Sequence, residues 1–337
     1  MRRINIPVFI PHEGCPNACV FCNQRSISGT VSFDPSKVDD LISEALTTID
    51  ADDHCEIAFF GGSFTGIDRG LMLYLLGIAQ KYVDCGRVQS IRLSTRPDYI
   101  NEEIISDLKK FSVKTVELGL QSFSDKVLTA SGRGHDSKCA IAACKAVKDA
   151  GFELIGQMMI GLPASDIKSE VLTARQIIEV GADGARVYPT VVFYDTELAN
   201  MTESGEYTPL SNEEAVMRTK EVLKIFDKSG IPCIRVGLCA SDNLADETHV
   251  MAGANHPSIG EMARSEVYFD SICEEIERQN IRGGELTVYV ARGCVSKAVG
   301  QKKHNKQRIC QKYGFKKVKV LEKNQILGYN IILEHNI

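Results

Sequence analysis

The chain has 337 residues, a length that predicts one large domain with a smaller one beside it. Apolar residues make up 44% of the chain and charged residues 25%, and no run approaches the roughly 18 to 20 apolar residues of a membrane span, so the composition excludes a membrane-spanning protein. The net charge of −5 is unevenly distributed, because the segment 282–337 contains twelve Lys and Arg residues but only three Glu.

The N-terminal segment, MRRINIPVFIPHEGC, begins with basic residues, but prolines and polar residues interrupt its apolar run. It lacks the apolar core and the small-residue cleavage site of a secretory signal, which predicts a cytoplasmic protein with no membrane partner. Twelve cysteines in a cytoplasmic chain are more typical of metal binding, catalysis or burial than of disulfides.

Strand patterns alternate with amphipathic helix patterns as far as about residue 240. The segment 34–49 predicts a helix with Asp34 as its N-cap and Pro35 in its first turn, and Ser211 with Glu214 has the spacing of a capping box. Repeated strand–helix units with apolar strands predict an α/β fold with a parallel sheet, either doubly wound or closed as a barrel. The strands are expected at 4–10, 55–60, 88–95, 113–120, 152–160, 184–189 and 232–238.

Several of these strands end in polar or glycine-rich sequence. In both arrangements of the sheet, ligands bind at the carboxyl ends of the strands, so this pattern indicates an enzyme. The strand ends in question read FFGGSFTG, LSTRPDY, ELGLQSF, MIGLP and RVYPT.

The basic tail has a pattern of its own. Strands are expected at 285–291, 316–322 and 326–334, with a helix at 304–314 that ends at Gly314. We therefore expect a barrel-like body over residues 1–240, a connecting region over 241–281 with one helix at 265–279, and a small α+β domain over 282–337.

Three cysteines are concentrated near the N-terminus, where Cys15, Cys19 and Cys22 follow the first strand with C-x3-C-x2-C spacing. Thiolates hold iron–sulfur clusters, usually four for each four-iron cluster, so three ligands leave one iron open to a substrate or cofactor. A structural zinc site needs four ligands, and His12 or a distant cysteine would supply the fourth. Spacing alone leaves both metals possible.

This cysteine motif, with an aromatic residue directly before its third cysteine, resembles the signature of radical S-adenosylmethionine (SAM) enzymes. The resemblance implies a partial (β/α)6 barrel of the TIM type. It also implies a [4Fe-4S] cluster held by the three cysteines, SAM on the open iron with Phe21 near the cofactor, and an electron donor such as flavodoxin or ferredoxin.

Later motifs fit the same resemblance in chain order. Gly61, Gly62 and Ser63 match the family's glycine motif, which receives the SAM amino group, although an ordinary strand-to-helix turn is the simpler interpretation of such glycines. By the same resemblance, Glu117 and Gln121 are expected to contact the ribose and methionine portions of SAM. The resemblance also implies a place near the adenine for Gly161, Arg186 and Tyr188.

A substrate pocket is expected to open near three residues, Tyr188, Tyr194 and Arg133. For all three, packing at the barrel rim is the more ordinary role.

The segment from about residue 10 to 230 resembles the radical SAM domain of the Elongator catalytic subunit, a tRNA wobble-uridine modifier. The most distinctive matching text is RVYPTVVFYDTELANMTESGEYTPLSNEEAV. That family spaces its first two cysteines more widely and carries an acetyltransferase domain without a counterpart here. We therefore expect a different radical reaction, or one carried out with a partner, and no acetyl-CoA chemistry.

The tail is similar to the helix–loop–helix–strand core of a KH domain, whose G-x-x-G loop grips an RNA backbone. Gly300 occupies the first glycine position, but Lys303 occupies the second. Phosphate contacts would come from Lys302, Lys303, Lys306 and Arg308. A lysine-rich solvated helix face is the ordinary alternative.

Three functions compete on these observations. The first is a radical SAM enzyme that modifies RNA, and the resemblance implies that this RNA is tRNA. The second is the same machinery acting on a small molecule such as a porphyrin precursor. The third is a metal-bound RNA-binding adaptor without turnover.

Overall fold

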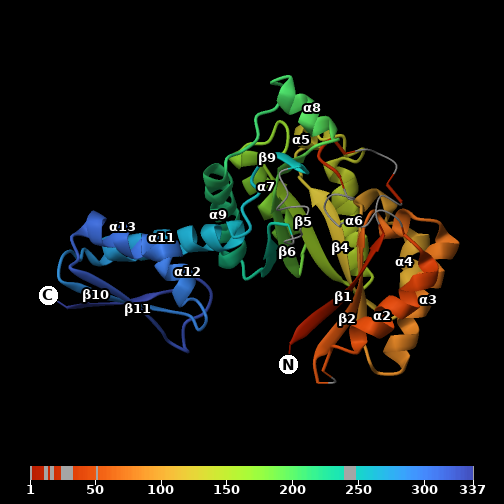
Figure 1. Cartoon of the computed structure of the whole chain (residues 1–337), viewed down its shortest axis with the longest axis horizontal. Coiled ribbons are helices and arrows are strands. Elements are labelled where there is room, and N and C mark those ends of the chain that lie inside the picture. Colours follow the sequence, from red (N-terminus) through yellow and green to blue (C-terminus); the bar gives the residue numbers. More distant parts are fainter. Residues whose placement is uncertain are drawn as a thin grey trace.

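The computed structural model describes residues 2–10, 14–15, 19–23, 33–50, 52–238 and 248–336. Its body is a curled parallel sheet with helices along its outer face, and its tail projects to one side (Figure 1). The sheet has the order β1-β2-β3-β4-β5-β6-β8 and forms a partial barrel, as predicted. Its strands are β1 (Arg3–Ile10), β2 (His54–Gly61), β3 (Ser90–Thr95), β4 (Val113–Gln121), β5 (Glu153–Ile160), β6 (Gly184–Pro189) and β8 (Cys233–Val236).

Local sequence fixes where the helices begin. Asp34 caps a short 3-10 turn and not the α-helix itself, so the helix predicted from residue 34 starts later. Ser211 and Glu214 form the predicted capping box. The helices of the body are η1 (Pro35–Lys37), α2 (Val38–Leu46), η2 (Phe64–Gly66), α3 (Arg69–Asp84), η3 (Pro97–Tyr99), α4 (Glu102–Leu108), α5 (Asp125–Ala130), α6 (Ser137–Asp149), α7 (Ile167–Glu179), α8 (Glu197–Glu203) and α9 (Asn212–Lys228).

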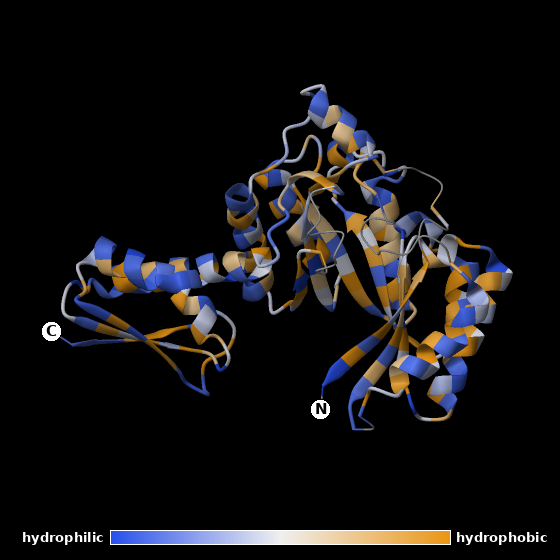
Figure 2. Cartoon of the chain, in the orientation of Figure 1, coloured by the Kyte–Doolittle hydropathy of each residue, from blue (hydrophilic) through white to orange (hydrophobic). Residues whose placement is uncertain are grey.

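Alternate residues of each strand face opposite ways. On β4, Val116, Leu118 and Leu120 belong to the main hydrophobic core, whereas Glu117 on the other face takes part in ion pairs with arginines. The helices mix hydrophilic and hydrophobic residues, as expected for elements with one face against a core (Figure 2). The concave face of the sheet therefore carries polar side chains that the core does not use.

A small two-stranded sheet was not predicted. β7 (Val191–Phe193) pairs antiparallel with β9 (Val250–Gly253). Both strands are too short to show a periodic pattern. Together with α8 they lie beside the carboxyl ends of the barrel strands (Figure 1).

The tail contains a three-stranded sheet in which β10 (Glu285–Val290) is central. It is parallel to β11 (Lys317–Glu322) and antiparallel to β12 (Ile332–Asn336). The predicted third strand began at residue 326, but a turn precedes it, and Gly328 in that turn has a φ of +60°. The tail helices are α12 (Val295–Val299), η4 (Gln301–Lys303) and α13 (His304–Tyr313).

One helix belongs to two cores. α11 (Ile259–Gln279) is longer than the predicted helix, and its first half packs in a hydrophobic cluster with α9 through Ile259, Ala263 and Val267. Its second half lies in the core of the tail together with the β10 side chains. The domain boundaries given above stay a prediction, and residues 239–247 lie outside the described residues. Within the described ranges, no helix combines the length and apolar character that a bilayer crossing requires.

Candidate active site at the barrel mouth

The barrel mouth is the region where the carboxyl ends of β1 to β4 meet the cysteine loop. Gly14, at the start of that loop, has a φ of +72°, and a Cβ there would lie 2.3 Å from the Ser63 carbonyl oxygen. Gly61 has a φ of +115°, and its Cβ would lie 2.6 Å from the Ile10 carbonyl oxygen. The cysteine loop and the glycine motif are therefore packed backbone against backbone, which only glycine allows.

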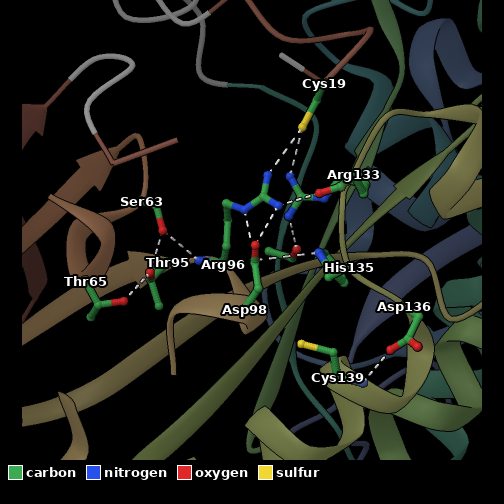
Figure 3. A network of polar contacts seen from close by, with 11 residues as sticks. Cys19, Ser63, Thr65, Thr95, Arg96, Asp98, Arg133, His135, Asp136 and Cys139 are labelled. Carbon is green, nitrogen blue, oxygen red and sulfur yellow. Dashed lines mark hydrogen bonds and ion pairs between the residues drawn. The ribbon is translucent and has the colours of Figure 1, made fainter. Parts of the chain in front are cut away.

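Cys19 lies between two arginines (Figure 3). Its Sγ accepts a hydrogen bond from Arg133 Nη1 at 3.2 Å and a longer one from Arg96 Nη1 at 3.8 Å. Cys19, Arg96 and Arg133 are each less than a tenth exposed. Both guanidinium groups therefore donate to the same buried sulfur.

Arg96 is held from several sides. It follows β3, and its Nε and Nη2 each donate to the Asp98 carboxylate at 2.9 Å. Nη2 also donates to the Arg133 carbonyl oxygen, and the Arg96 backbone N–H donates to Ser63 Oγ at 3.2 Å. Burial would raise the pKa of Asp98, but Arg96 outweighs that effect and holds the pKa below its usual range.

His135 lies next to Asp98, with its Nδ1 3.8 Å from Asp98 Oδ1, and its side chain is only 1% exposed. Burial, supported by the charge of Arg133, lowers the pKa of His135 to about 4. Its ring is therefore uncharged at neutral pH.

The other two cysteines are near this network in sequence. The Cys22 backbone N–H donates to the Cys19 carbonyl oxygen at 2.9 Å, and burial raises the pKa of the Cys15 thiol, with Arg96 acting against burial. No three Cys, His, Asp or Glu side chains form a metal-binding group among the described residues, and residues 11–13 and 16–18 are not described. The assignment of the three cysteines stays a prediction, and His12, the alternative zinc ligand, lies outside the described residues.

The donor chemistry fits an iron–sulfur cluster better than a site for a hard cation. Sulfur is the donor at all three predicted positions, and the charged groups that contact Cys19 are cations. Cations suit a cluster whose thiolates and sulfides make it negative. Arg133 Nε is buried without a hydrogen-bond partner among the described residues, which leaves a donor for a bound group.

The segment after Cys19 rests on the small sheet and α8. Val20 accepts from the Leu198 backbone N–H at 2.8 Å and donates to the Ser131 carbonyl oxygen at 3.2 Å. Phe21 packs against a cluster that contains Val192 and Leu198. The predicted cofactor role of Phe21 is untested, but its contacts show what holds this part of the loop.

Ser63 connects the ends of β2 and β3. Its hydroxyl is buried and hydrogen-bonded to Thr95 Oγ1 at 2.8 Å, and Thr95 Oγ1 also contacts Thr65 Oγ1 at 2.6 Å. The Gly62 backbone N–H donates to the Ile10 carbonyl oxygen at 2.8 Å. The predicted SAM contacts of Gly61, Gly62 and Ser63 stay predictions, on a loop fixed by hydrogen bonds to both neighbouring strands.

An ion-pair network crosses the concave face of the sheet. The Glu117 carboxylate is almost fully buried, and it pairs with Arg92 at 2.9 Å and with Arg186 at 2.8 Å. Arg92 also pairs with Glu56 at 2.8 Å, and Arg186 donates to the Tyr188 hydroxyl at 3.2 Å. Two of the predicted cofactor residues, Glu117 and Arg186, therefore form an ion pair with each other.

Gln121 and Gly161 end neighbouring strands. Gln121 has a φ of +62° at a bulge of β4, and its buried Oε1 has no hydrogen-bond partner among the described residues. Strain together with an unsatisfied oxygen is typical of a ligand-contacting residue. Gly161 instead has both backbone groups in use, since it donates to Glu170 at 2.8 Å and accepts from Tyr207 at 2.6 Å.

The tail residues predicted to bind RNA fall into two groups. Gly300, Lys302 and Lys303 line one cavity, of about 410 Å³, together with Glu261 and Ser265 of α11. Arg308 is engaged within the protein, since it pairs with Glu266 at 2.6 Å and lies over the Phe269 ring. The assignment as a whole stays a prediction.

The sequence analysis missed Arg96, Asp98 and His135. The text T-R-P-D-Y does contain a signal, because an arginine and an aspartate two residues apart on either side of a proline are placed to pair across a tight turn. Arg133 was interpreted as rim packing. Its contact with Cys19 depends on a tertiary approach that spacing in the sequence does not indicate.

Comparison with known proteins supports the assignment of the fold and the family. The Radical SAM superfamily model matches residues 9–176, and the Radical_SAM C-terminal domain model matches residues 182–268. A solved structure of an N-terminally deleted Elp3 from the archaeon Methanocaldococcus infernus is similar, with a TM-score of 0.61 and 21% identity over 83% of this chain and 64% of that one.

Two curated relatives are informative. The chain is 27% identical to a tRNA uridine(34) acetyltransferase of Methanocaldococcus jannaschii in an alignment 299 positions long that covers 76% of this chain and 54% of the relative. It is 28% identical over 176 residues to Elongator complex protein 3 of Homo sapiens, or 51% and 31% of the two chains. The chain thus spans about half or less of the length of these relatives. Since both family models and the partial barrel agree, the chain belongs to the radical SAM superfamily and resembles its Elongator branch.

Proposed function

We propose that this protein is a radical SAM enzyme that modifies tRNA. Its similarity to a tRNA uridine(34) acetyltransferase extends over 76% of the chain, further than the matched barrel model, which supports a related substrate. The observation that carries the RNA assignment is a turn in the tail whose lysines have no acidic partners among the residues that the structure describes.

At the barrel mouth, Cys15, Cys19 and Cys22 would hold a [4Fe-4S] cluster. The cluster and SAM, when bound, supply a one-electron cleavage that yields a radical able to remove hydrogen from the substrate. A donor such as flavodoxin or ferredoxin would deliver the electron. Gly61, Gly62 and Ser63 would bind the amino end of SAM, on a loop that hydrogen bonds to Ile10 and Thr95 hold in place.

The concave face would orient the rest of the cofactor. Gln121 Oε1, buried and without a partner among the described residues, is suited to accept from a ribose hydroxyl. Glu117 is fixed by Arg92 and Arg186, so its carboxylate is oriented before any ligand arrives. Tyr188, next to Arg186, would lie near the adenine.

Four lysines at and beside the α12–η4 turn have no acidic partner within the described ranges of the tail. Among the described residues, no acidic side chain pairs with Lys297, Lys302, Lys303 or Lys306, whereas Lys312 and Lys319 pair with Glu277 and Glu285. Cations without internal partners are available to neutralise phosphates.

The backbone of this lysine loop is held in an unusual conformation. Lys302 and Lys303 have φ values of +49° and +65°, a region that costs lysine about 1–2 kcal/mol per residue. Asn305 is buried and donates to the Ser265 carbonyl oxygen and hydroxyl at 2.9 Å, which ties the loop to α11. The fixed loop geometry, with lysines facing a cavity, supports a role in contacting a phosphate backbone.

The test is tRNA binding as a function of salt concentration. We expect affinity to fall with added salt, and the triple change Lys302→Ala, Lys303→Ala, Lys306→Ala to reduce the slope of log K against log salt by about 2 to 3. A matched control, Lys312→Ala with Lys319→Ala, removes paired cations and should leave the slope nearly unchanged. Equal slopes for both variants would contradict the assignment of the lysine loop.

The reaction itself is tested by nucleoside mass spectrometry on tRNA from a deletion strain and its parent. Loss of one modified nucleoside, restored by the parent gene but not by a Cys19→Ala gene, is the expected result. Unchanged tRNA, with a small-molecule intermediate accumulating instead, would favour the porphyrin-precursor type of substrate. Unchanged tRNA binding by a protein that never cleaves SAM would favour the adaptor.

A further inference from the structure

The guanidinium groups that contact Cys19 are not needed to complete a set of metal ligands. Arg96 and Arg133 are 3% and 5% exposed, and both approach the same sulfur. Arg133 is anchored by its Nη2, which donates to the Gly119 carbonyl oxygen at 2.6 Å on β4. Two buried cations are therefore held at fixed positions beside one predicted cluster ligand.

The charges in this group do not cancel. Asp98 pairs with Arg96 through two hydrogen bonds of 2.9 Å, so these two side chains are close to neutral together. Among the described residues no acidic side chain pairs with Arg133, and its guanidinium donates to a sulfur and to a carbonyl oxygen. One positive charge remains, away from water that would screen it.

We infer that Arg133, with Arg96 and Asp98 behind it, sets the reduction potential of an iron–sulfur cluster at Cys19. The inference rests on the proposed cluster. Reduction adds one negative charge to the cluster, and a nearby fixed cation stabilises the reduced state more than the oxidised state, which raises the potential. The N–H···S contacts act in the same direction, because they stabilise charge on sulfur.

In this arrangement Arg133 and Arg96 act on the cluster as positioning residues through their charge. Asp98 has the opposite effect on the reduction potential. Removing the charge of Arg133 should lower the potential. Removing the charge of Asp98 should raise it, because Arg96 then stays positive without compensation. A role in packing alone predicts no such opposition, since both changes would simply loosen the loop.

The experiment is a potentiometric titration, followed by electron paramagnetic resonance, of anaerobically reconstituted protein without SAM. We expect Arg133→Gln to shift the one-electron equilibrium about tenfold toward the oxidised state, which corresponds to about 59 mV lower potential. Asp98→Asn should shift it in the other direction, and Arg133→Lys should stay near the parent. Iron and sulfide content is measured for every variant.

Arg69→Gln is the matched control. Arg69 also pairs with a buried aspartate, Asp107, at 2.7 Å, but it lies on α3, and its partners there are carboxylates and not cysteine sulfur. The cluster of the Arg69→Gln variant should have the same reduction potential as that of the parent protein.

Equal potentials for Arg133→Gln, Asp98→Asn and the parent, at equal cluster content, would overturn the inference. If Arg133→Gln takes up no cluster, the comparison of Arg133→Lys with Asp98→Asn decides, and a potential of Asp98→Asn no higher than that of Arg133→Lys overturns it. A parent protein that takes up no iron would overturn the proposed function itself, and this inference with it.

Discussion

The barrel mouth and the tail loop use cations in opposite ways. At the mouth and on the adjoining concave face, Arg92, Arg96 and Arg186 are buried or nearly so, and each is paired with a carboxylate of the protein. Arg133 is buried too, but its hydrogen bonds go to the Cys19 sulfur and to a carbonyl oxygen. In the tail loop, Lys302 and Lys303 extend from a strained turn and pair with no acidic group among the described residues. The first region is organised before any ligand arrives, and the second has charges that a ligand would neutralise.

This difference separates chemistry from recruitment. A fixed mouth keeps reacting groups in place and excludes water, which is what a radical reaction requires. An open lysine loop gives affinity that depends on salt and little on sequence. Changes at the mouth should therefore alter reactivity or stability, whereas changes in the loop should alter binding.

The largest expected effect comes from the cysteine loop. Cys19→Ala should abolish cluster uptake and SAM cleavage, because it removes a predicted cluster ligand and the sulfur that Arg96 and Arg133 contact. Iron and sulfide content with anaerobic cleavage of SAM measures this. Cys144→Ala, a fully buried core position on α6, should keep its iron. Full iron in the Cys19 variant would contradict the assignment.

The next effect is on stability. Glu117→Gln should lower the free energy of unfolding by about 3–5 kcal/mol, because it leaves Arg92 and Arg186 buried with less compensation. Glu285→Gln breaks a tail pair whose two side chains are both 47% exposed, and should cost about 0–1 kcal/mol. Denaturant unfolding of the two variants checks the contrast, and equal losses would show that the mouth network is not special.

His135 gives the stability of the mouth a dependence on acid. Its pKa is lowered to about 4 from the usual 6.5, so its contribution to stability is complete above pH 6.5 and is lost as the pH falls toward 4. The loss should reach about 3 kcal/mol. Unfolding measured across this pH range should be flatter for His135→Gln than for the parent. An equal pH dependence of the two proteins would contradict this role of His135.

The smallest effect distinguishes two cations of α13. Arg308→Ala should cost about 1 kcal/mol of stability, because Arg308 pairs with Glu266 and stacks on Phe269. Lys306→Ala should leave stability unchanged and weaken tRNA binding more than the Arg308 change does. If Arg308→Ala weakens tRNA binding more than Lys306→Ala does, and Lys306→Ala costs more stability, then Arg308 and not Lys306 faces the nucleic acid.

Much of the fold follows from periodicity. The seven barrel strands have apolar residues that pack against helices, and their spacing made them visible in the sequence. β7 and β9 were not visible, because strands of three and four residues are shorter than a recognisable repeat. The start of β12 was misplaced because the apolar run from Ile326 includes a turn at Gly328.

The site was only partly visible. Cysteine spacing and glycine motifs are local, so they could be found in one sequence. The contacts of Arg133 with Cys19, and of Glu117 with Arg186, join residues 114 and 69 positions apart and depend on how strands are ordered in the sheet. Burial and hydrogen bonds at those positions are properties of the assembled barrel.

The helix α11 has a consequence for how the protein unfolds. Its 21 residues form a rod about 30 Å long, with one half in the cluster shared with α9 and the other half in the tail core. Melting either half would fray the other, since helical turns propagate cooperatively. The body and tail should therefore lose structure in one transition, and whatever pulls on the tail would be felt mechanically in the body.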